Sequence, residues 1–177
     1  EWISSVPKHV ILYEKFGFDL PKFAHLPLIL NSDKSKLSKR QGDVAVEDFL
    51  EKGYLPEALV NFVSLLGFNP TGDREIYDIS ELIATFELSS INKGGAVFDV
   101  EKLKWINSQY IKKLDFEKLF KLTKPLVDSK IDDVFFLKVL KVEQERLILL
   151  NDISERVGDY EHLSDYDSEL IRWKKSD

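Results

Sequence analysis

Residues 26–42 read LPLILNSDKSKLSKRQG, in which an apolar run is followed at once by a polar, cationic one. The apolar run, Leu26–Leu30, is typical of a short buried β-strand. The polar run contains four cations: Lys34, Lys36, Lys39 and Arg40. Small residues between these cations favour a pliable loop whose backbone can approach a ligand closely. A loop of this kind at the end of a strand in an α/β sheet often binds nucleotide phosphates, and a solvated surface loop is the alternative.

The composition is that of a folded protein with a modest negative charge. The 177 residues are enough for one large domain or two small ones, and 44% of them are hydrophobic. The net charge of −6 argues against a small domain devoted wholly to nucleic acid, although it is compatible with a local basic patch. The absence of cysteine excludes disulfides and thiolate metal sites.

Metal sites and membrane segments are not indicated by the sequence. His9, His25 and His162 lie far apart and have no metal-ligand spacing. No apolar run approaches the ~20 residues that span a bilayer, and no signal peptide is visible, so we expect a cytoplasmic protein that binds neither a metal nor a membrane. The chain lacks methionine and starts within an expected helix, so we expect it to be a downstream piece of a longer protein.

The chain is predicted to be mainly helical, with one short strand, because apolar residues recur at helical spacing between helix-stop signals. The first expected helix begins at Ser4 or Ser5 and ends at Gly17. The others are expected over residues 44–52, 55–66, 79–86, 99–111, 115–125, 134–150 and 159–177. Their ends are marked by Pro56 and Gly67, and by the N-cap candidates Asp78, Asp99 and Asp115. A domain boundary is expected near residues 113–115.

The stretch Lys36-Leu37-Ser38-Lys39-Arg40 resembles the Lys-Met-Ser-Lys-Ser signature of class I aminoacyl-tRNA synthetases. Further segments resemble the bacterial-type glutamyl-tRNA synthetases of that class: Trp2–His9, Phe23–Asn31, Tyr54–Leu59, Arg74–Ile76 and Val97–Leu103. The signature motif alone is weak evidence, but its combination with these segments over residues 1–115 is specific.

This resemblance implies a mainly α fold divided into three regions. Residues 1–43 would be the end of a Rossmann catalytic domain, with a short β remnant and the signature loop. Residues 44–114 would be a helical region that contacts the tRNA stem, and residues 115–177 the start of a helical anticodon-binding region. In glutaminyl enzymes the chain after the loop leads toward β-barrels, and no such pattern follows here.

The resemblance also implies ligation of glutamate to tRNA(Glu) through glutamyl-adenylate, with ATP and Mg²⁺ as the substrate complex. In the family, a His-Ile-Gly-His-type motif and most of the glutamate pocket belong to an earlier part of the catalytic domain that these residues do not contain. We therefore expect the chain by itself to be inactive. The alternative function is a non-catalytic helical module that binds RNA or protein, in which the lysine loop is ion-paired or simply exposed.

Position by position, the resemblance assigns roles to the cationic loop. Lys36 and Lys39 take the two lysine places of the motif and are the catalytic candidates, with Lys39 facing the ATP phosphates and the departing pyrophosphate. Ser38 would shape the loop and donate a hydrogen bond, and Arg40 replaces the final serine of the motif; both are expected to bind ATP, as is Lys39. Activation of a carboxylate by ATP needs no enzyme nucleophile, so catalysis would consist of positioning and charge stabilisation, for which lysines serve as flexible point charges.

The resemblance places the adenine of ATP beside the strand. Leu28 and Ile29 match positions whose backbone cradles the adenine in the family. Trp2 matches a tryptophan near the ATP site, and a structural role at the domain edge is its alternative. We expect His25, next to the strand, to be a packed histidine.

Three further groups have both an RNA-binding and a structural interpretation. Asn107 and Tyr110 match a segment near the tRNA elbow, but Trp105 and Tyr110 are expected to pack, because aromatic residues at helical spacing more often belong to a core. Lys93 with Gly94 and Gly95 could bind a phosphate or form an ordinary loop. A band of lysines could face RNA or be a solvated helix face: Lys112, Lys113, Lys118, Lys121 and Lys124. Residues 73–75 are expected to form a solvated turn.

Overall fold

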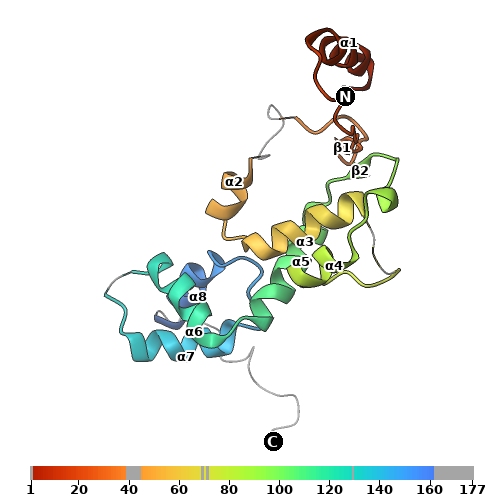
Figure 1. The fold of residues 1–177 in the computed structure, drawn as a ribbon. Helices are drawn as coiled ribbons and strands as arrows, with labels where there is room; N and C mark the ends of the chain where they lie inside the picture. The colour runs from red at the N-terminus through yellow and green to blue at the C-terminus, as the bar shows by residue number, and fades with distance from the viewer. Residues whose placement is uncertain (1, 39–44, 69, 71, 129, 162–177) are drawn as a thin grey trace, which may run out of the picture.

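The computed structural model describes residues 2–38, 45–68, 70, 72–128 and 130–161, and its architecture is mainly helical, as predicted (Figure 1). The elements follow one another in space much as they do in sequence. Helix α1 lies at one end, the β1–β2 pair joins it to helices α3, α4 and α5, and helices α6–α8 form the other end.

The N-terminal part is a helix followed by an extended segment that leads to a strand. A single 3-10 turn, η1 (Ile3–Ser5), precedes α1 (Val6–Phe16), which ends at Gly17 as predicted. Strand β1 (Ile29–Leu30) pairs in parallel with β2 (Ala96–Val97), so that Ile29 lies opposite Ala96 and Leu30 opposite Val97.

The strand is shorter and more exposed than the predicted buried strand over residues 26–30. Leu26 is 68% exposed and Leu28 is 40% exposed. Both residues precede the paired part of β1, which has a single parallel neighbour of two residues, and a sheet of this size cannot cover both of its faces. The prediction of one strand was also incomplete, because β2 follows the Gly94-Gly95 segment that had been interpreted as a loop.

The central part is built on the packing of α3 (Pro56–Gly67) against α5 (Val100–Lys113). Phe62, Leu103 and Ile106 are each at most 1% exposed in this contact. The shorter elements of this part surround the pair: α2 (Val46–Glu51), α4 (Ile79–Thr85) and η2 (Leu88–Ser90). The predicted starts of α3, α4 and α5 are confirmed, whereas α2 begins at Val46, inside the helix predicted over residues 44–52. The Asp99 carboxylate accepts a hydrogen bond from Lys102 N at 3.1 Å at the start of α5.

The C-terminal part contains α6 (Phe116–Thr123), η3 (Lys124–Leu126), α7 (Asp133–Glu143) and α8 (Asp152–Glu161). The predicted helix over residues 134–150 is too long, because α7 ends at Glu143. The chain then turns, which buries Leu147 and Leu150. The carboxylate of Asp152, the first residue of α8, accepts hydrogen bonds from the backbone N–H groups of Ile148 and Leu149 in this turn. Helix α8 begins earlier than the helix expected over residues 159–177, of which residues 162–177 lie outside the described part.

A joint connects the C-terminal helices to α3 and α5. The Asn107 side chain, fully buried in α5, accepts a hydrogen bond from Leu55 N at 2.8 Å and donates one to Ile148 O at 2.6 Å. Leu150 N also donates to Gly53 O at 3.0 Å. The predicted domain boundary near residues 113–115 stays a prediction, but the hydrogen bonds to Ile148 O and from Leu150 N cross it. Asn107 therefore has a packing role here, and not the exposure that RNA contact would require.

Within the described residues, none of the helices combines the length and the apolar character that crossing a membrane would demand.

The joint predicts that Gly53→Ala will destabilise the chain by at least about 2 kcal/mol. Gly53 has a positive φ of 91°, and an added Cβ would lie 2.7 Å from Asn151 N and 2.9 Å from Leu150 N. Both contacts are with backbone, which cannot move aside without opening the joint. The free energy of unfolding in urea measures the effect. Gly94→Ala is the matched control, because a Cβ at Gly94 meets no atom within 4 Å, and it should change stability by less than about 0.5 kcal/mol. Equal stability of the two variants would contradict this account.

Candidate functional site

The cationic stretch begins as a turn that folds back onto β1. Leu37 N donates a hydrogen bond to Ile29 O at 3.0 Å, and Lys36 forms an antiparallel bridge with Leu30. Strand β1 therefore lies between β2 on one side and residues 36–37 on the other. The first half of the predicted pliable loop is thus held in a defined register.

Side chains within the turn close it. Asp33 Oδ1 accepts a hydrogen bond from Ser35 N, and Asn31 Nδ2 donates one to Ser35 Oγ, both at 2.8 Å. Asn31 N donates to Ser35 O, also at 2.8 Å. The hydrogen bonds from the Ser35 hydroxyl and then from its backbone N–H lower the pKa of Asp33 below its usual value, so the acceptor stays ionised at neutral pH.

The turn holds Lys34 in the left-handed region, with φ of 66°. Among the described residues it is the one non-glycine residue with a positive φ. This conformation costs an L-residue about 1–2 kcal/mol, and it persists where the surrounding contacts determine it. The strain therefore lies two residues before the signature motif.

Only part of the predicted ATP site lies within the described residues. Lys36 is exposed, Leu37 and Ser38 are half-buried, and Lys39 and Arg40 lie outside the described residues. Leu28 and Ile29 have backbone carbonyls that accept hydrogen bonds from Ala96 N and Leu37 N. The roles given to all these residues stay predictions.

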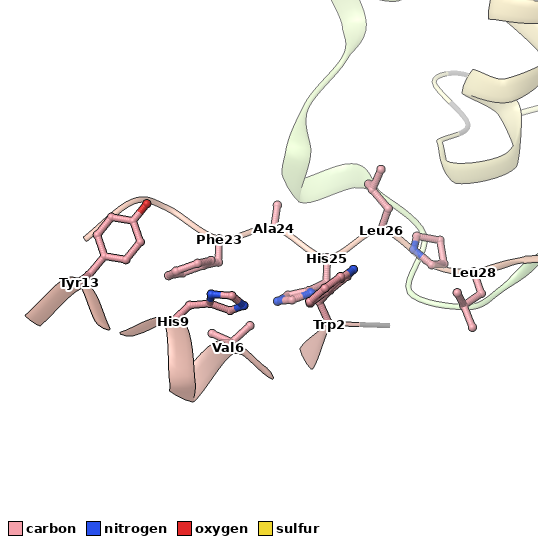
Figure 2. Close-up of a pocket in the computed structure, with 10 residues that line it drawn as sticks. Trp2, Val6, His9, Tyr13, Phe23, Ala24, His25, Leu26 and Leu28 are labelled. Atoms are coloured by element: carbon pink, nitrogen blue, oxygen red, sulfur yellow. The ribbon is translucent and has the colours of Figure 1, made fainter. Parts of the chain in front are cut away.

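A cavity of about 580 Å³ lies between α1 and the segment before β1 (Figure 2). It brings together Trp2 and Leu28, two of the residues matched to the ATP site. His9 faces the same space, with its ring centroid 6.2 Å from that of Trp2. His25 is exposed and lines the cavity, so the prediction of a packed histidine is wrong.

Sequence reasoning missed the roles of His9 and Tyr13 as cavity-lining residues. The available signal was the spacing of Trp2, Val6, His9 and Tyr13, which repeats at four, three and four residues and so marks one face of a helix. The segment that closes the cavity from the other side, Phe23–Leu28, has no comparable pattern.

Most of the lysine band is paired within the chain. Lys118 lies 3.1 Å from Glu57, Lys121 lies 2.6 Å from Glu117, and Lys124 lies 2.6 Å from Asp133. Lys124 Nζ also donates to Ile131 O at 2.7 Å and lies over the ring of Phe136. These contacts support the structural interpretation of the band.

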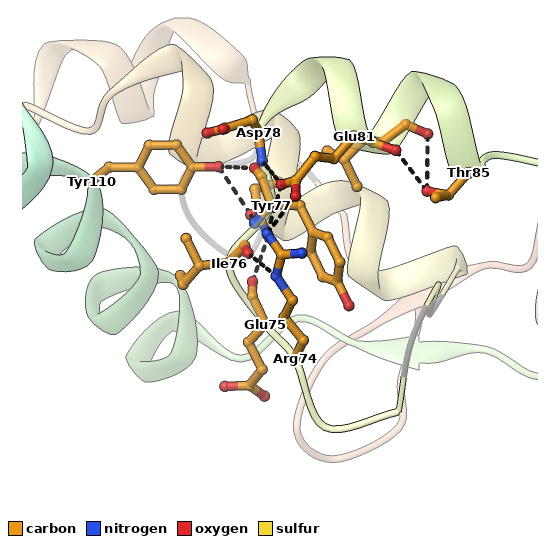
Figure 3. A network of polar contacts seen from close by, with 10 residues as sticks. Arg74, Glu75, Ile76, Tyr77, Asp78, Glu81, Thr85 and Tyr110 are labelled. Atoms are coloured by element: carbon orange, nitrogen blue, oxygen red, sulfur yellow. Dashed lines mark hydrogen bonds and ion pairs between the residues drawn. The ribbon is translucent and has the colours of Figure 1, made fainter.

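The segment predicted to be a solvated turn is exposed at Asp73 and Arg74, as expected, and it is also the base of a polar network (Figure 3). Arg74 Nη2 contacts both carboxylate oxygens of Glu81, at 2.6 and 2.8 Å, and Arg74 Nε donates to Ile76 O at 2.9 Å. The Glu81 carboxylate also accepts from Asp78 N at 2.7 Å, which completes one half of the predicted capping box of α4. The network fixes residues 74–78 against the start of α4.

The Tyr110 hydroxyl completes this network from α5. It lies 2.6 Å from Tyr77 O and 2.9 Å from Asn61 Oδ1, and its single proton serves one of them at a time. The fully buried Asn61 side chain accepts from Tyr77 N and donates to Glu75 O. Burial raises the pKa of Tyr110 to about 12. Tyr110 is therefore used in packing, as predicted, whereas Trp105 is 45% exposed and the prediction that it packs is wrong.

Within the described ranges, no three His, Cys, Asp or Glu side chains are grouped so that they could hold a metal ion.

The family model for the catalytic domain of tRNA synthetases class I (E and Q) matches residues 1–105. The chain belongs to this family. It is 54% identical over 133 residues to the glutamate–tRNA ligase of Prosthecochloris aestuarii, a match that covers 74% of this chain and 26% of that protein. It is 48% identical over 170 residues to the glutamate–tRNA ligase of Clostridioides difficile, covering 89% of this chain and 34% of that protein.

Solved structures give the same family. The crystal structure of a glutamate tRNA ligase from Elizabethkingia meningosepticum, in complex with its amino acid, superposes with a TM-score of 0.81 at 33% identity. That match covers 98% of this chain and 39% of the other. The chain thus spans about a quarter to a third of the length of the curated relatives named above. The resemblance to glutamyl-tRNA synthetases is confirmed, and the family match includes the signature motif and the cavity.

Tyr110→Phe should lower the free energy of unfolding by about 1 kcal/mol, because Tyr77 O loses its hydrogen bond from the hydroxyl. The wild-type contribution should be complete below pH 10 and be lost as the pH rises from 10 to about 12, since the unfolded phenol ionises first. Unfolding measured in this range, with phenolate absorbance at 295 nm, tests both effects. Tyr13→Phe is the control, because the structure records no hydrogen bond for the Tyr13 hydroxyl among the described residues. A Tyr110 phenol that ionises near pH 10 would contradict the prediction.

Proposed function

We propose that this chain is part of a glutamate–tRNA ligase, which attaches glutamate to tRNA(Glu) through glutamyl-adenylate, using ATP with Mg²⁺. The observation that carries the proposal is the signature motif at the end of β1, in a chain that belongs to the class I (E and Q) family and has close relatives named glutamate–tRNA ligase. The cytoplasm, where tRNA is charged, is the proposed location.

In this proposal the lysines stabilise charge on the leaving pyrophosphate. Lys39 neutralises the phosphates most directly and Lys36 supports it, while Ser38 shapes the loop and, together with Arg40, binds ATP. Loss of one such donor typically raises a barrier by about 2.7–4 kcal/mol. The backbone of Leu28 and Ile29 cradles the adenine. The shared cavity of Trp2 and Leu28 supports a nucleotide site on this face of the chain.

The division of labour follows the three proposed regions. Residues 1–43 supply the nucleotide-binding edge of the catalytic domain, residues 44–114 contact the tRNA stem, and residues 115–177 begin the anticodon-binding region. The hydrogen bonds from Asn107 Nδ2 to Ile148 O and from Leu150 N to Gly53 O support a fixed arrangement of the last two regions.

A hybrid ligase tests the proposal: the C. difficile ligase in which the matching segment is replaced by this chain. We expect it to catalyse ATP–pyrophosphate exchange with glutamate and tRNA(Glu). Lys39→Ala and Lys36→Ala should each lower the exchange rate at least about tenfold, equivalent to about 1.36 kcal/mol. Lys121→Ala is the matched control, because this exposed lysine is paired with Glu117, and its removal should leave the rate unchanged. A folded but inactive hybrid would overturn the proposed function, and full activity of Lys39→Ala would reject the role of Lys39.

A further inference from the structure

We propose that Asn31 and Asp33 are positioning residues: they close the turn over residues 31–35 and so set the register in which the signature motif leaves β1. The inference rests on the proposed function. Neither residue belongs to the motif, and neither is assigned a role by the family resemblance.

The hydrogen bonds of the turn converge on Ser35, the residue directly before the motif. Its backbone N–H is held by Asp33 and its hydroxyl by Asn31, each at 2.8 Å, and its carbonyl accepts from Asn31 N. Lys34 N also donates to Asn31 O at 2.9 Å. Three hydrogen bonds therefore fix Ser35, the residue that precedes the first motif residue, Lys36.

Register matters because side chains alternate along an extended segment. Lys36 is exposed and Leu37 is half-buried, and Leu37 N pairs with Ile29 O. A slip of one residue would exchange these two side chains between the faces and shift the motif by about 3.3 Å. Catalytic groups must be held to within about 0.5 Å, so a slip of this size would remove the motif from its place.

The left-handed conformation of Lys34 is the weak point of the turn. A lysine does not adopt it readily, so the hydrogen bond from Ser35 N to Asp33 is needed to hold it. A glycine at this position would adopt the same φ without that help. The dependence of activity on Asp33 should therefore be greatest when residue 34 is not glycine.

The experiment measures kcat and KM for ATP–pyrophosphate exchange in the hybrid ligase. Asp33→Ala removes the acceptor and should lower kcat about tenfold, with KM for glutamate changed less than twofold. Asp33→Asn keeps an acceptor oxygen at the same place and should retain kcat within about threefold. In a Lys34→Gly background, Asp33→Ala should cost no more than about threefold relative to Lys34→Gly alone.

Each outcome decides between the inference and its alternatives. Equal losses in Asp33→Asn and Asp33→Ala would mean that the charge of Asp33 matters and not its hydrogen bond, which would overturn the inference. The same tenfold loss in the Lys34→Gly background, or no loss in Asp33→Ala, would also overturn it.

The Lys39→Ala variant separates a failure of the inference from a failure of the proposed function. If Lys39→Ala is fully active as well, the proposed function has failed; if Lys39→Ala is impaired while Asp33→Ala is not, the positioning role alone has failed. Should Asp33→Ala not fold, the Asp33→Asn variant and the Asn31→Ala variant, for which we expect at least a threefold loss of kcat, keep the test decisive.

Discussion

Two backbone hydrogen bonds hold the N-terminal segment on the helical part of the chain: Ala96 N donates to Leu28 O at 3.3 Å, and Phe98 N donates to Leu30 O at 2.8 Å. They bring together residues that lie more than sixty positions apart in the sequence. The approach is close, because a Cβ at Gly95 would lie 2.8 Å from the Leu30 side chain and 3.1 Å from Leu28 O. After the turn over residues 31–35, Lys36 pairs with the other edge of β1. The position of the turn therefore depends on the pairing of β1 with β2.

The pairing is joined to the core through Phe98, the residue after β2. The Phe98 ring lies 5.0 Å from that of Phe62 and 5.6 Å from that of Phe49, in edge-on and tilted contacts that stabilise aromatic pairs. Phe62 is on α3, which packs on α5, and α5 carries Asn107 into the joint with the C-terminal helices. A continuous set of packed elements therefore runs from the turn to α8.

The sequence was most informative where the signal was local. The starts of α3, α5 and α6 were predicted because proline and capping aspartates act within one turn of helix. The end of α7 was missed because Leu147 and Leu150 continue an apolar pattern while packing from a turn. Strand β2 was missed because its pairing is with a distant segment and is only two residues long. The buried role of Asn107 was equally hidden, since its partners are 52 and 41 residues away.

In the candidate site, too, the features with local sequence signals could be predicted and those that depend on distant contacts could not. The signature motif could be recognised from consecutive residues, whereas the cavity of Trp2 and His25 depends on how an extended segment folds over α1. The turn over residues 31–35 lies between these cases: the hydrogen bond from Ser35 N to Asp33 is local, but the strain at Lys34 becomes visible only in the backbone.

Under the proposed function this turn has a physical role. A lysine carries its charge on a long, flexible stem that can follow a departing phosphate, but its reach is useful only if the stem starts from a fixed place. The backbone of the turn supplies that fixed origin, so the side chains alone need to move.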